Sequence, residues 1–525
     1  MAAKPGRGAS PQPGARSNAT CRGVDARPRA FYSSTVTHPL GGKTSIAIGV
    51  MLVLLAIPYT TPSLARFRVA RAPWDKADPA AETMAEAATG GVPAPAPTQG
   101  ETSLAASKNE ATVTNALPEA PALAQPSAAS LAKTKGSIAI DDPSGHALDA
   151  FYTRLAHTKN KEAGAVTRIL HYGDSVLTSD YVSGTMRRKM QAEFGDAGHG
   201  FILVAKPWDW YFHNDVIQGA TEGWSSSRVT GPFVKDTMYG VGGVSFTGSV
   251  GARSWYGTGT GQTYGKKVSR FDVYYLETPN GGEVELEAQI NGERKNERFS
   301  TKGDTKTSRI KSFSVPDGEA KMTLKVVSGS PRLFGVALER EEPGVIYDSL
   351  GANGGRGELL GAMDADHWKE QMDLRDPALV MLHYGTNESE GMVSKDAYEK
   401  TLRALVDKVK AAAPKASVLV VAPLDRAEKN EATGALHTKP VIKKLVECQK
   451  KVAAEANVGF WNTYEAMGGD GSMASWVKKG LAGSDLTHPS PQGAEILGDL
   501  LYKALTSGYE AWPGSKAGGQ PHPTD

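Results

Sequence analysis

The sequence predicts an α/β protein with a doubly wound parallel sheet that is interrupted by an inserted β-sandwich. Apolar runs suited to buried strands alternate with amphipathic helical segments, which is typical of parallel strands joined by crossover helices. Two of these runs, 166–170 and 378–382, lead into the same tetrapeptide, Leu-His-Tyr-Gly. Between them, residues 206–343 lose the helical pattern and alternate with period two between turn residues, which indicates antiparallel strands.

The elements on either side of the insertion belong together, because residues 145–205 and 344–508 sum to one ordinary α/β domain. Helical periodicity and strand-like apolar runs alternate along both parts. The pattern predicts helices at 144–156, 180–194, 364–372, 398–413, 439–456 and 491–505, and strands at 166–170, 378–382, 417–422 and 458–461.

The inserted segment, 206–343, reads as several short strands separated by strong turn signals such as Pro279-Asn280-Gly281-Gly282. This pattern is typical of a β-sandwich. The alternation is clearest at 271–275, 284–290, 313–315, 322–326 and 334–338. The insertion lies between Ser175 and Gly351, so we expect both of its ends to be held at the active-site edge of the sheet.

The N-terminal region does not read as part of a globular domain. Residues 1–44 contain a single acidic residue, Asp25, and predict a basic disordered segment. Residues 45–65 hold the apolar run 46–57 and a small-residue triplet, which suits a signal peptide or an uncleaved membrane anchor. Either alternative exports the rest of the chain to the periplasm or cell envelope.

Two further stretches predict disorder. Residues 66–144 are rich in Ala, Pro, Thr and Ser and lack sustained periodicity, so they predict an extended linker. Residues 509–525 form a short disordered tail. If the apolar segment is retained, the linker tethers the catalytic domain to the membrane.

The composition narrows the choice of partners. Of 525 residues, 59 are basic and 57 acidic, for a formal net charge of +2, which gives no argument for binding nucleic acid. The two cysteines, Cys21 and Cys448, are not placed for an internal disulfide. No His, Cys, Asp and Glu cluster has metal-ligand spacing, so we expect catalysis without a metal or another cofactor.

A serine follows the first strand at the point where a helix begins. Gly173-Asp174-Ser175 comes directly after the apolar run, and Asp180 can cap the next helix. A hydroxyl at such a turn lies at the carboxyl edge of the sheet, where open α/β folds bind ligands. Its backbone N–H points where an oxyanion could form.

A serine hydroxyl is a weak nucleophile and needs a base nearby. Asp485-Leu486-Thr487-His488 supplies a histidine with a carboxylate three residues before it, in front of the last helix. His171 and His383 are rival bases, but on buried strands we expect them to pack or to bond locally.

Taken together, the blocks Gly173-Asp174-Ser175, Gly385-Thr386-Asn387 and Asp485-Leu486-Thr487-His488 resemble those of the SGNH (GDSL-type) hydrolases. The segment 347–354 looks like the remaining block, with Gly351 as its glycine. Each block alone suits an ordinary turn, but all four are present in the family's order. The resemblance covers roughly 145–205 and 344–508.

The resemblance implies a role for each of these residues. Ser175 is the nucleophile, His488 takes and returns the proton, and Asp485 orients the imidazole. The oxyanion hole consists of the N–H groups of Ser175 and Gly351 and the side-chain amide of Asn387. Two positions depart from the common family pattern, Val176 after Gly-Asp-Ser and Glu388 after Asn387.

Within this family the sequence is most similar to the peptidoglycan O-acetylesterase type. The likeness rests on His-x-Gly-Asp-Ser, Phe-Gly-Asp-x-Gly at 194–198, Tyr-Gly-Thr-Asn-Glu and the inserted β-domain, which this resemblance implies to be similar to carbohydrate-binding modules. This implies a serine esterase that removes O-acetyl groups from an acetylated polysaccharide of the cell envelope. Aromatic side chains of the insertion, above all Trp208 and Trp210, suit the flat faces of sugars.

Three alternatives stay open from the sequence. A polysaccharide O-acetyltransferase uses the same triad with a sugar in place of water as acceptor. A lipase or lysophospholipase needs a long apolar channel. A non-enzymatic glycan-binding envelope protein would have a broken triad, whereas this one is complete.

Overall fold

The computed structural model describes residues 138–260, 263–290, 292–391 and 394–515. The predicted basic segment, the signal peptide or anchor, nearly all of the linker and most of the tail lie outside these residues. Within the described parts of the chain, no helix is both long and apolar enough to cross a membrane.

A five-stranded parallel sheet forms the centre of the α/β part, in the spatial order β13-β1-β14-β15-β18. The order along the chain reverses beside β1, and open α/β sheets bind their ligands at such a reversal. The strands are β1 (Val166–Gly173), β13 (Gly344–Gly351), β14 (Leu379–His383), β15 (Ser417–Val421) and β18 (Gly459–Trp461).

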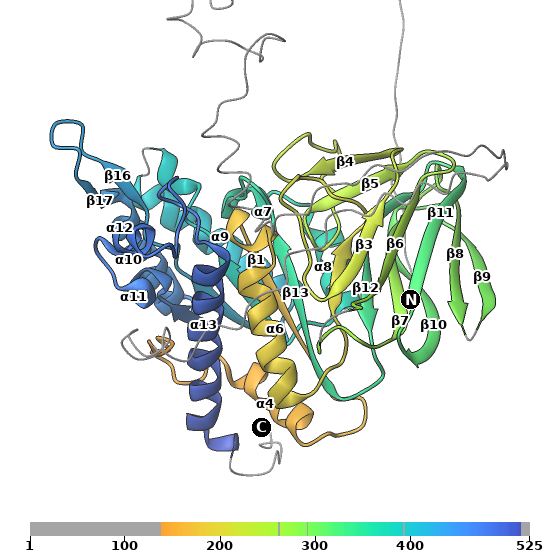
Figure 1. Cartoon of the computed structure of the whole chain (residues 1–525), viewed down its shortest axis with the longest axis horizontal. Coiled ribbons are helices and arrows are strands. Elements are labelled where there is room, and N and C mark those ends of the chain that lie inside the picture. The colour runs from red at the N-terminus through yellow and green to blue at the C-terminus, as the bar shows by residue number, and fades with distance from the viewer. Residues whose placement is uncertain (1–137, 261–262, 291, 392–393, 516–525) are drawn as a thin grey trace, which may run out of the picture. The chain divides into compact units, whose positions relative to one another are not determined.

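Helices cover both faces of this sheet, because alternate residues of each strand point to opposite sides. Ile169 packs with the helices of one face and Leu170 with those of the other. One layer contains α4 (Asp149–Lys159), α6 (Tyr181–Phe194) and α13 (Pro491–Ala511), and the other contains α8 (Ala365–Arg375), α9 (Lys395–Ala412) and α10 (Pro440–Glu455). Figure 1 shows α6 and α13 side by side.

Short elements lie mainly in the loops of the α/β part. They are α5 (Ser175–Thr178), α7 (Gly357–Gly361), η2 (Glu388–Glu390), β16 (Ala427–Lys429), β17 (Leu436–Thr438), α11 (Thr463–Met467), α12 (Ser472–Lys478) and η3 (Pro513–Ser515).

Two antiparallel sheets form the inserted sandwich. The first has the order β10-β7-β12-β5-β4 with β2 paired to β12, and the second has the order β3-β6-β11-β8-β9. The strands are β2 (Gly200–Leu203), β3 (Val216–Ala220), β4 (Trp224–Arg228), β5 (Val244–Gly248), β6 (Arg253–Thr258), β7 (Val268–Glu277), β8 (Gly282–Ile290), β9 (Glu293–Ser300), β10 (Thr307–Gly318), β11 (Lys321–Gly329) and β12 (Arg332–Glu339).

The predicted fold class is confirmed. The five predicted ranges with the clearest alternation lie within β7, β8, β10, β11 and β12. The sequence missed β9, which reads Glu-Arg-Lys-Asn-Glu-Arg-Phe-Ser and lies at a sheet edge. Charged edge strands protect against further pairing and carry no apolar alternation. We also did not predict β13 as a strand, although every one of its residues pairs with a residue of β1.

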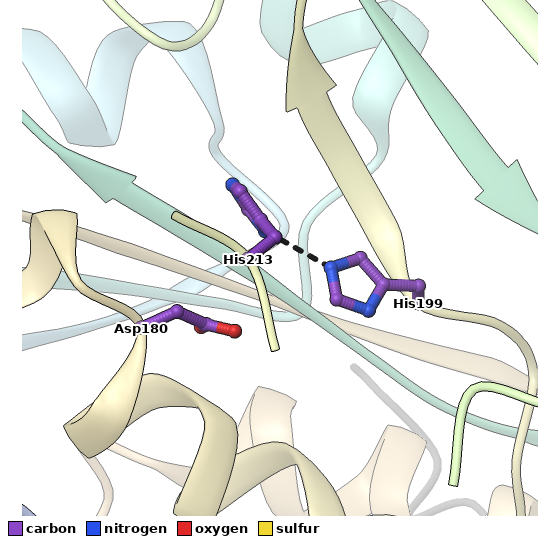
Figure 2. A group of neighbouring side chains, drawn as sticks. All are labelled: Asp180, His199 and His213. Atoms are coloured by element: carbon purple, nitrogen blue, oxygen red, sulfur yellow. Dashed lines mark hydrogen bonds between the residues drawn. The ribbon is translucent and has the colours of Figure 1, made fainter. Parts of the chain in front are cut away.

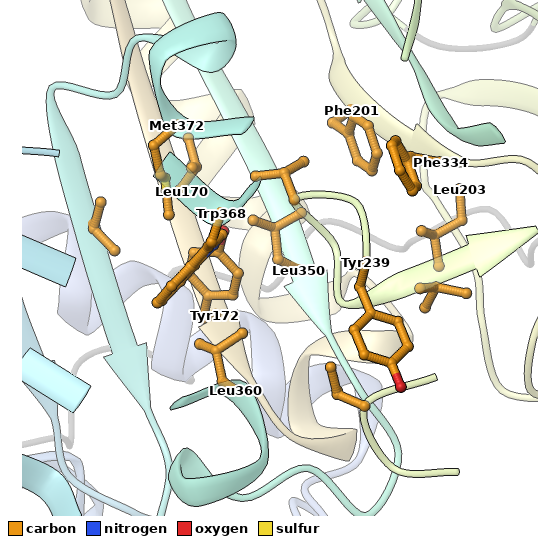
Figure 3. Close-up of a cluster of buried hydrophobic side chains, with 14 of the residues drawn as sticks. Leu170, Tyr172, Phe201, Leu203, Tyr239, Phe334, Leu350, Leu360, Trp368 and Met372 are labelled. Carbon is orange, nitrogen blue, oxygen red and sulfur yellow. The ribbon is translucent and has the colours of Figure 1, made fainter. Parts of the chain in front are cut away.

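The sandwich and the parallel sheet share one hydrophobic core. Figure 3 shows side chains of β1, β13 and α8 beside side chains of β2 and β12. The labelled residues are Leu170, Tyr172, Phe201, Leu203, Tyr239, Phe334, Leu350, Leu360, Trp368 and Met372. The insertion is therefore packed onto the sheet as part of one structure, because its removal would expose this apolar surface to water.

A buried cluster of charged side chains joins the same two parts. Arg375 of α8 donates to both carboxylate oxygens of Asp348 in β13, at 2.6 and 2.8 Å, and also to Glu339 of β12. Arg168 of β1 and Arg270 of β7 bind Glu339 as well, at 2.8 and 3.0 Å. Because buried charges are costly without partners, these contacts tie the position of β12 to that of the parallel sheet.

The expectation that both ends of the insertion are held at the active-site edge is wrong. Gly344, at the start of β13, pairs with Val166 at the start of β1, and Asp196 forms a bridge with Val345. The chain therefore leaves and re-enters the sheet at the amino ends of its strands, opposite Ser175. The antiparallel region also begins at β2, before the boundary predicted at 206.

Candidate active site

Ser175 lies immediately after β1, at the first position of the short helix α5. Asp174 caps this helix, since its side chain accepts a hydrogen bond of 3.0 Å from the N–H of Val176. Burial raises the pKa of Asp174, against the effect of that hydrogen bond. Asp174 thus organises the turn, as the sequence predicts, and Ser175 is left half-buried at the carboxyl edge of the sheet.

His488 and Asp485 complete a hydrogen-bonded row with Ser175. The Ser175 Oγ lies 2.8 Å from Nε2 of His488, and Nδ1 of His488 lies 2.7 Å from Oδ2 of Asp485. A carboxylate only accepts hydrogen bonds, so Nδ1 carries the proton and Nε2 is the acceptor for the serine hydroxyl. This is the tautomer that a general base needs in order to take a proton from serine.

Local hydrogen bonds hold Asp485 in its charged form. Its Oδ1 accepts the backbone N–H groups of Thr487 and His488, both at 3.0 Å. Burial alone would raise the pKa of Asp485, but the hydrogen bonds from His488 hold it below its ordinary value.

The backbone of this loop is strained between its two functional residues. Leu486 has φ of 59°, in the left-handed region that a branched side chain rarely adopts. Its carbonyl accepts the N–H of Ala427, and its N–H donates to the carbonyl of Gly483. Ser490 then caps α13 through the N–H of Gly493. Such supports are needed to keep a residue in a sparsely populated conformation.

The predicted oxyanion residues lie at or just after the carboxyl ends of neighbouring strands of the sheet. Ser175 follows β1, Gly351 is the last residue of β13 and pairs with Gly173, and Asn387 lies four residues after β14 ends at His383. The Nδ2 of Asn387 donates to the carbonyl of Gly355 at 2.9 Å, which fixes the orientation of the amide. An amide nitrogen has two hydrogens, so one remains available to a ligand.

Gly351 lies against the helix that carries Ser175. A Cβ on Gly351 would lie 2.8 Å from both the Cβ of Leu177 and the backbone nitrogen of Thr178. A real Cβ atom does not come that close to other heavy atoms, so only glycine allows β13 to end so close to α5.

Glu388, which sequence reasoning noted only as a departure from the family pattern, joins two loops of the site. Its two carboxylate oxygens accept the N–H of Gly357 at 2.9 Å and the N–H of Gly385 at 3.0 Å. Gly357 lies close to Gly355 in the chain, and Gly385 lies close to Asn387, so Glu388 joins the loops that carry these two residues. Burial raises the pKa of Glu388 to about 7, against the effect of the hydrogen bond from Gly357.

We predict that Glu388 makes stability depend on pH. Its pKa rises from 4.5 in the unfolded chain to about 7, so between these values the folded state binds a proton that the unfolded state has lost. The free energy of unfolding should therefore decrease as pH rises from about 5 to about 7. In Glu388→Gln this slope should flatten, and one glycine N–H loses its acceptor at a cost of about 1–3 kcal/mol.

Thermal unfolding at several pH values measures both effects. Glu431→Gln, which removes an exposed carboxylate, is the control and should keep the slope of the wild type. An unchanged slope in Glu388→Gln would show that another group is responsible.

The two strand histidines pack against each other beneath the site. The rings of His171 and His383 stack with centroids 5.4 Å apart and planes 9° apart, and Nδ1 of His171 lies 2.9 Å from the hydroxyl of Tyr347. Burial lowers the pKa of His383 to about 4 and that of His171 well below its ordinary value. Both rings are therefore neutral and belong to the interior of the sheet.

Three residues of metal-ligand type meet in the interior although they are distant in sequence. Asp180, His199 and His213 offer ligand atoms within 4.8 Å of one another, and Figure 2 shows the 2.9 Å hydrogen bond between the histidines. Asp180 occupies the N-cap position of α6, but its side chain makes no capping hydrogen bond. Its two carboxylate oxygens accept hydrogen bonds from Arg187 at 2.6 and 3.2 Å, and one also accepts the N–H of Asn214 at 2.9 Å.

This donor set fits an ion pair better than a metal site. Arg187 already supplies the positive charge beside Asp180, and a divalent cation bound there would lie next to that guanidinium. The group is therefore a structural support beneath the start of α6.

The structure separates the two tryptophans predicted to contact substrate. Trp208 is half-buried and lines a groove of about 610 Å³ together with Arg228 from the sandwich and Asn353 and Arg356 from the loop after Gly351. Trp210 is 69% exposed and packs against Phe212 outside this groove. Trp208 therefore has the better position for contact with a bound molecule.

Part of the chain matches a known protein family. Residues 323–496 match the GDSL-like Lipase/Acylhydrolase family, a range that includes Gly351, Asn387, Asp485 and His488. Ser175 lies outside the matched range, on the other side of the insertion. Comparison with curated proteins gives no match.

A solved structure, that of a peptidoglycan O-acetylesterase, has the same fold. It superposes with a TM-score of 0.60 at 20% identity, covering 71% of this chain and 99% of that one. A family two carbohydrate esterase from Cellvibrio japonicus gives a TM-score of 0.24 at 12% identity, over 56% of this chain and 98% of that one.

The family match defines the class of protein as a carboxylic ester hydrolase. Residues 323–496 match the model of the GDSL-like lipase/acylhydrolase family, and the parallel sheet of this part is interrupted by the sandwich.

Proposed function

We propose that the enzyme is a serine O-acetylesterase that removes acetyl groups from a glycan of the cell envelope, such as peptidoglycan. The observation that carries the proposal is the row Ser175 Oγ, His488 Nε2 and Nδ1, and Asp485 Oδ2, with contacts of 2.8 and 2.7 Å. The similarity to a peptidoglycan O-acetylesterase, which extends through the inserted sandwich, supports this choice of ester.

In the first half of the reaction, Oγ of Ser175 attacks the acetyl carbonyl carbon while its proton passes to Nε2 of His488. The carbonyl oxygen becomes an oxyanion, which the N–H groups of Ser175 and Gly351 and the free amide hydrogen of Asn387 stabilise. The intermediate collapses, and the sugar oxygen leaves with the proton from His488. Asp485 stabilises the imidazolium in between.

In the second half, water attacks the acetyl group on Ser175 and gives a proton to His488. The proton returns to Oγ when acetate leaves, so the serine is regenerated. A sugar hydroxyl in place of water would make the enzyme a transferase, with the same residues in the same roles.

Acetate release from O-acetylated peptidoglycan tests the proposal, with and without a non-acetylated acceptor oligosaccharide. We expect acetate as the main product in both reactions. Acetyl transfer to the acceptor as the dominant reaction would identify a transferase. Hydrolysis of long-chain acyl esters in preference to acetates would identify a lipase.

We also propose that the enzyme acts outside the cytoplasm, because residues 45–65 suit a signal peptide or an anchor. Cell fractionation followed by N-terminal sequencing of the mature protein tests this. A chain that begins near residue 66 indicates cleavage, and full-length protein in the membrane fraction indicates an anchor. Full-length protein in the cytoplasmic fraction contradicts export.

A further inference from the structure

The groove lined by Trp208 has walls from both parts of the enzyme, and hydrogen bonds connect one wall to the short helix that carries the nucleophile. The hydroxyl of Thr178 in α5 lies 3.0 Å from the Ser175 carbonyl and 3.0 Å from the Asn353 side-chain oxygen. Asn353 in turn lines the groove. A molecule bound in the groove would therefore extend along the loop that connects Gly351 with Gly355, whose carbonyl orients Asn387.

Arg228 of the sandwich is held in this groove by neutral partners. Its Nε donates to the carbonyl of Gly231 at 2.7 Å, its Nη1 donates to the carbonyl of Pro207 at 2.6 Å, and its guanidinium lies 5.7 Å from the ring of Trp208. Among the described residues, no carboxylate lies within ion-pairing distance of Arg228, and its Nη2 makes no hydrogen bond. The side chain is thus oriented in advance, with a charge that no neighbouring residue neutralises.

A second arginine faces the same space from the α/β part. Arg356 is 43% exposed, and its nearest carboxylate, Glu358, lies 3.9 Å away and is itself 56% exposed. Glu358 is the only acidic residue among the groove's described lining. The groove therefore carries two arginines, one weakly paired glutamate and one aromatic face.

This combination has a preferred ligand. Guanidinium groups bind carboxylates through two parallel N–H groups, and charge-assisted hydrogen bonds of this kind are stronger than neutral ones. The tryptophan ring offers a flat face to the apolar side of a sugar. A monosaccharide with a carboxylate substituent satisfies both features, whereas a neutral sugar or an acyl chain leaves the arginines unpaired.

We propose that the groove is a subsite for a sugar carboxylate, in which Arg228 and Arg356 bind the acid and Trp208 contacts the ring. The inference rests on the proposed function and extends it, because it selects acetylated glycans that carry an acidic residue next to the acetylated one. The carboxylate could belong to a lactyl ether, as in muramic acid, or to a uronic acid.

The kinetic test compares O-acetylated peptidoglycan with the same material after its carboxyl groups have been capped as methylamides. Phenyl acetate is the small-ester reference. We expect Arg228→Gln and Arg356→Gln each to lower kcat/KM on intact glycan roughly tenfold to hundredfold more than on phenyl acetate, mainly through KM. On capped glycan this excess loss should disappear. High salt should weaken the wild type's preference for intact glycan.

Arg253→Gln is the matched control, because Arg253 is an exposed arginine of the sandwich that does not line the groove. It should behave as the wild type on all three substrates. Equal wild-type rates on intact and capped glycan would overturn the proposal, as would equal losses on glycan and phenyl acetate in both groove variants. Arg356 is at the surface, so its variant remains informative if Arg228→Gln folds poorly.

A binding experiment separates failure of this subsite from failure of the proposed function. Full-length Ser175→Ala protein is titrated with N-acetylmuramic acid, with glucuronic acid and with the methyl ester of each. Binding of an acid but not of its ester supports the subsite if this binding is lost in Arg356→Gln, even if no glycan releases acetate. The acid that binds more tightly identifies the source of the carboxylate. Absence of any difference between acid and ester overturns it.

Discussion

Replacing Ser175 with alanine is expected to abolish ester hydrolysis while leaving the domain folded. Among the described residues, the hydroxyl makes one hydrogen bond, of 2.8 Å with His488, so little stability depends on it. Triad residues act as a unit, and loss of the nucleophile costs about a millionfold in other serine hydrolases. Phenyl acetate hydrolysis and labelling by a fluorophosphonate measure the effect.

Ser179→Ala is a suitable control, because Ser179 follows the same short helix and its side chain makes no hydrogen bond with a described residue. It should keep both activity and labelling. Labelling that persists in Ser175→Ala would mean that another residue is the nucleophile.

Asn387→Ala is expected to lower the turnover number roughly 10²-fold to 10³-fold and to change KM little. A single oxyanion donor is typically worth that much, because it binds the transition state more strongly than the substrate. The hydrogen bond from Asn387 to Gly355 orients the amide in advance, so the donor needs no rearrangement during the reaction.

Asn387→Asp separates this electrostatic role from a structural one. The aspartate has the same shape but offers an acceptor and a negative charge where the amide offers a donor, so turnover should decrease at least as much as in the alanine variant. Turnover that is unchanged in both variants would show that Asn387 only supports its turn. Steady-state kinetics on phenyl acetate provide the comparison.

The shared core changes how the inserted sandwich has to be studied. Deleting residues 206–343 would expose Leu350, and it would leave His367 without Tyr239 and Arg375 without Glu339. Such a protein would lose activity through misfolding, whatever the sandwich contributes to the site. Point variants in the groove keep the core intact and therefore test the contribution to substrate choice.

The sequence by itself determined the order and type of most elements, because helical and strand periodicity are local properties of a chain. The predicted strand at 378–382 is β14, and the predicted helix at 439–456 is α10. The four short blocks also named the candidate site residues, since a nucleophile, a base and an orienting acid need particular side chains. The structure then brings Ser175, His488 and Asp485 into one row.

Only the tertiary structure decided which distant segments meet. Three features depend on packing between segments far apart in the chain. They are the pairing of β13 with β1, the entry of the insertion at the amino ends of the strands, and the burial of Glu388. The same holds for Arg228 and Arg356, because nothing in the local sequence distinguishes them from other arginines, and only the fold brings both into the lining of one groove. Local sequence cannot encode such neighbours, because the contacts form only when the two parts of the chain share one core.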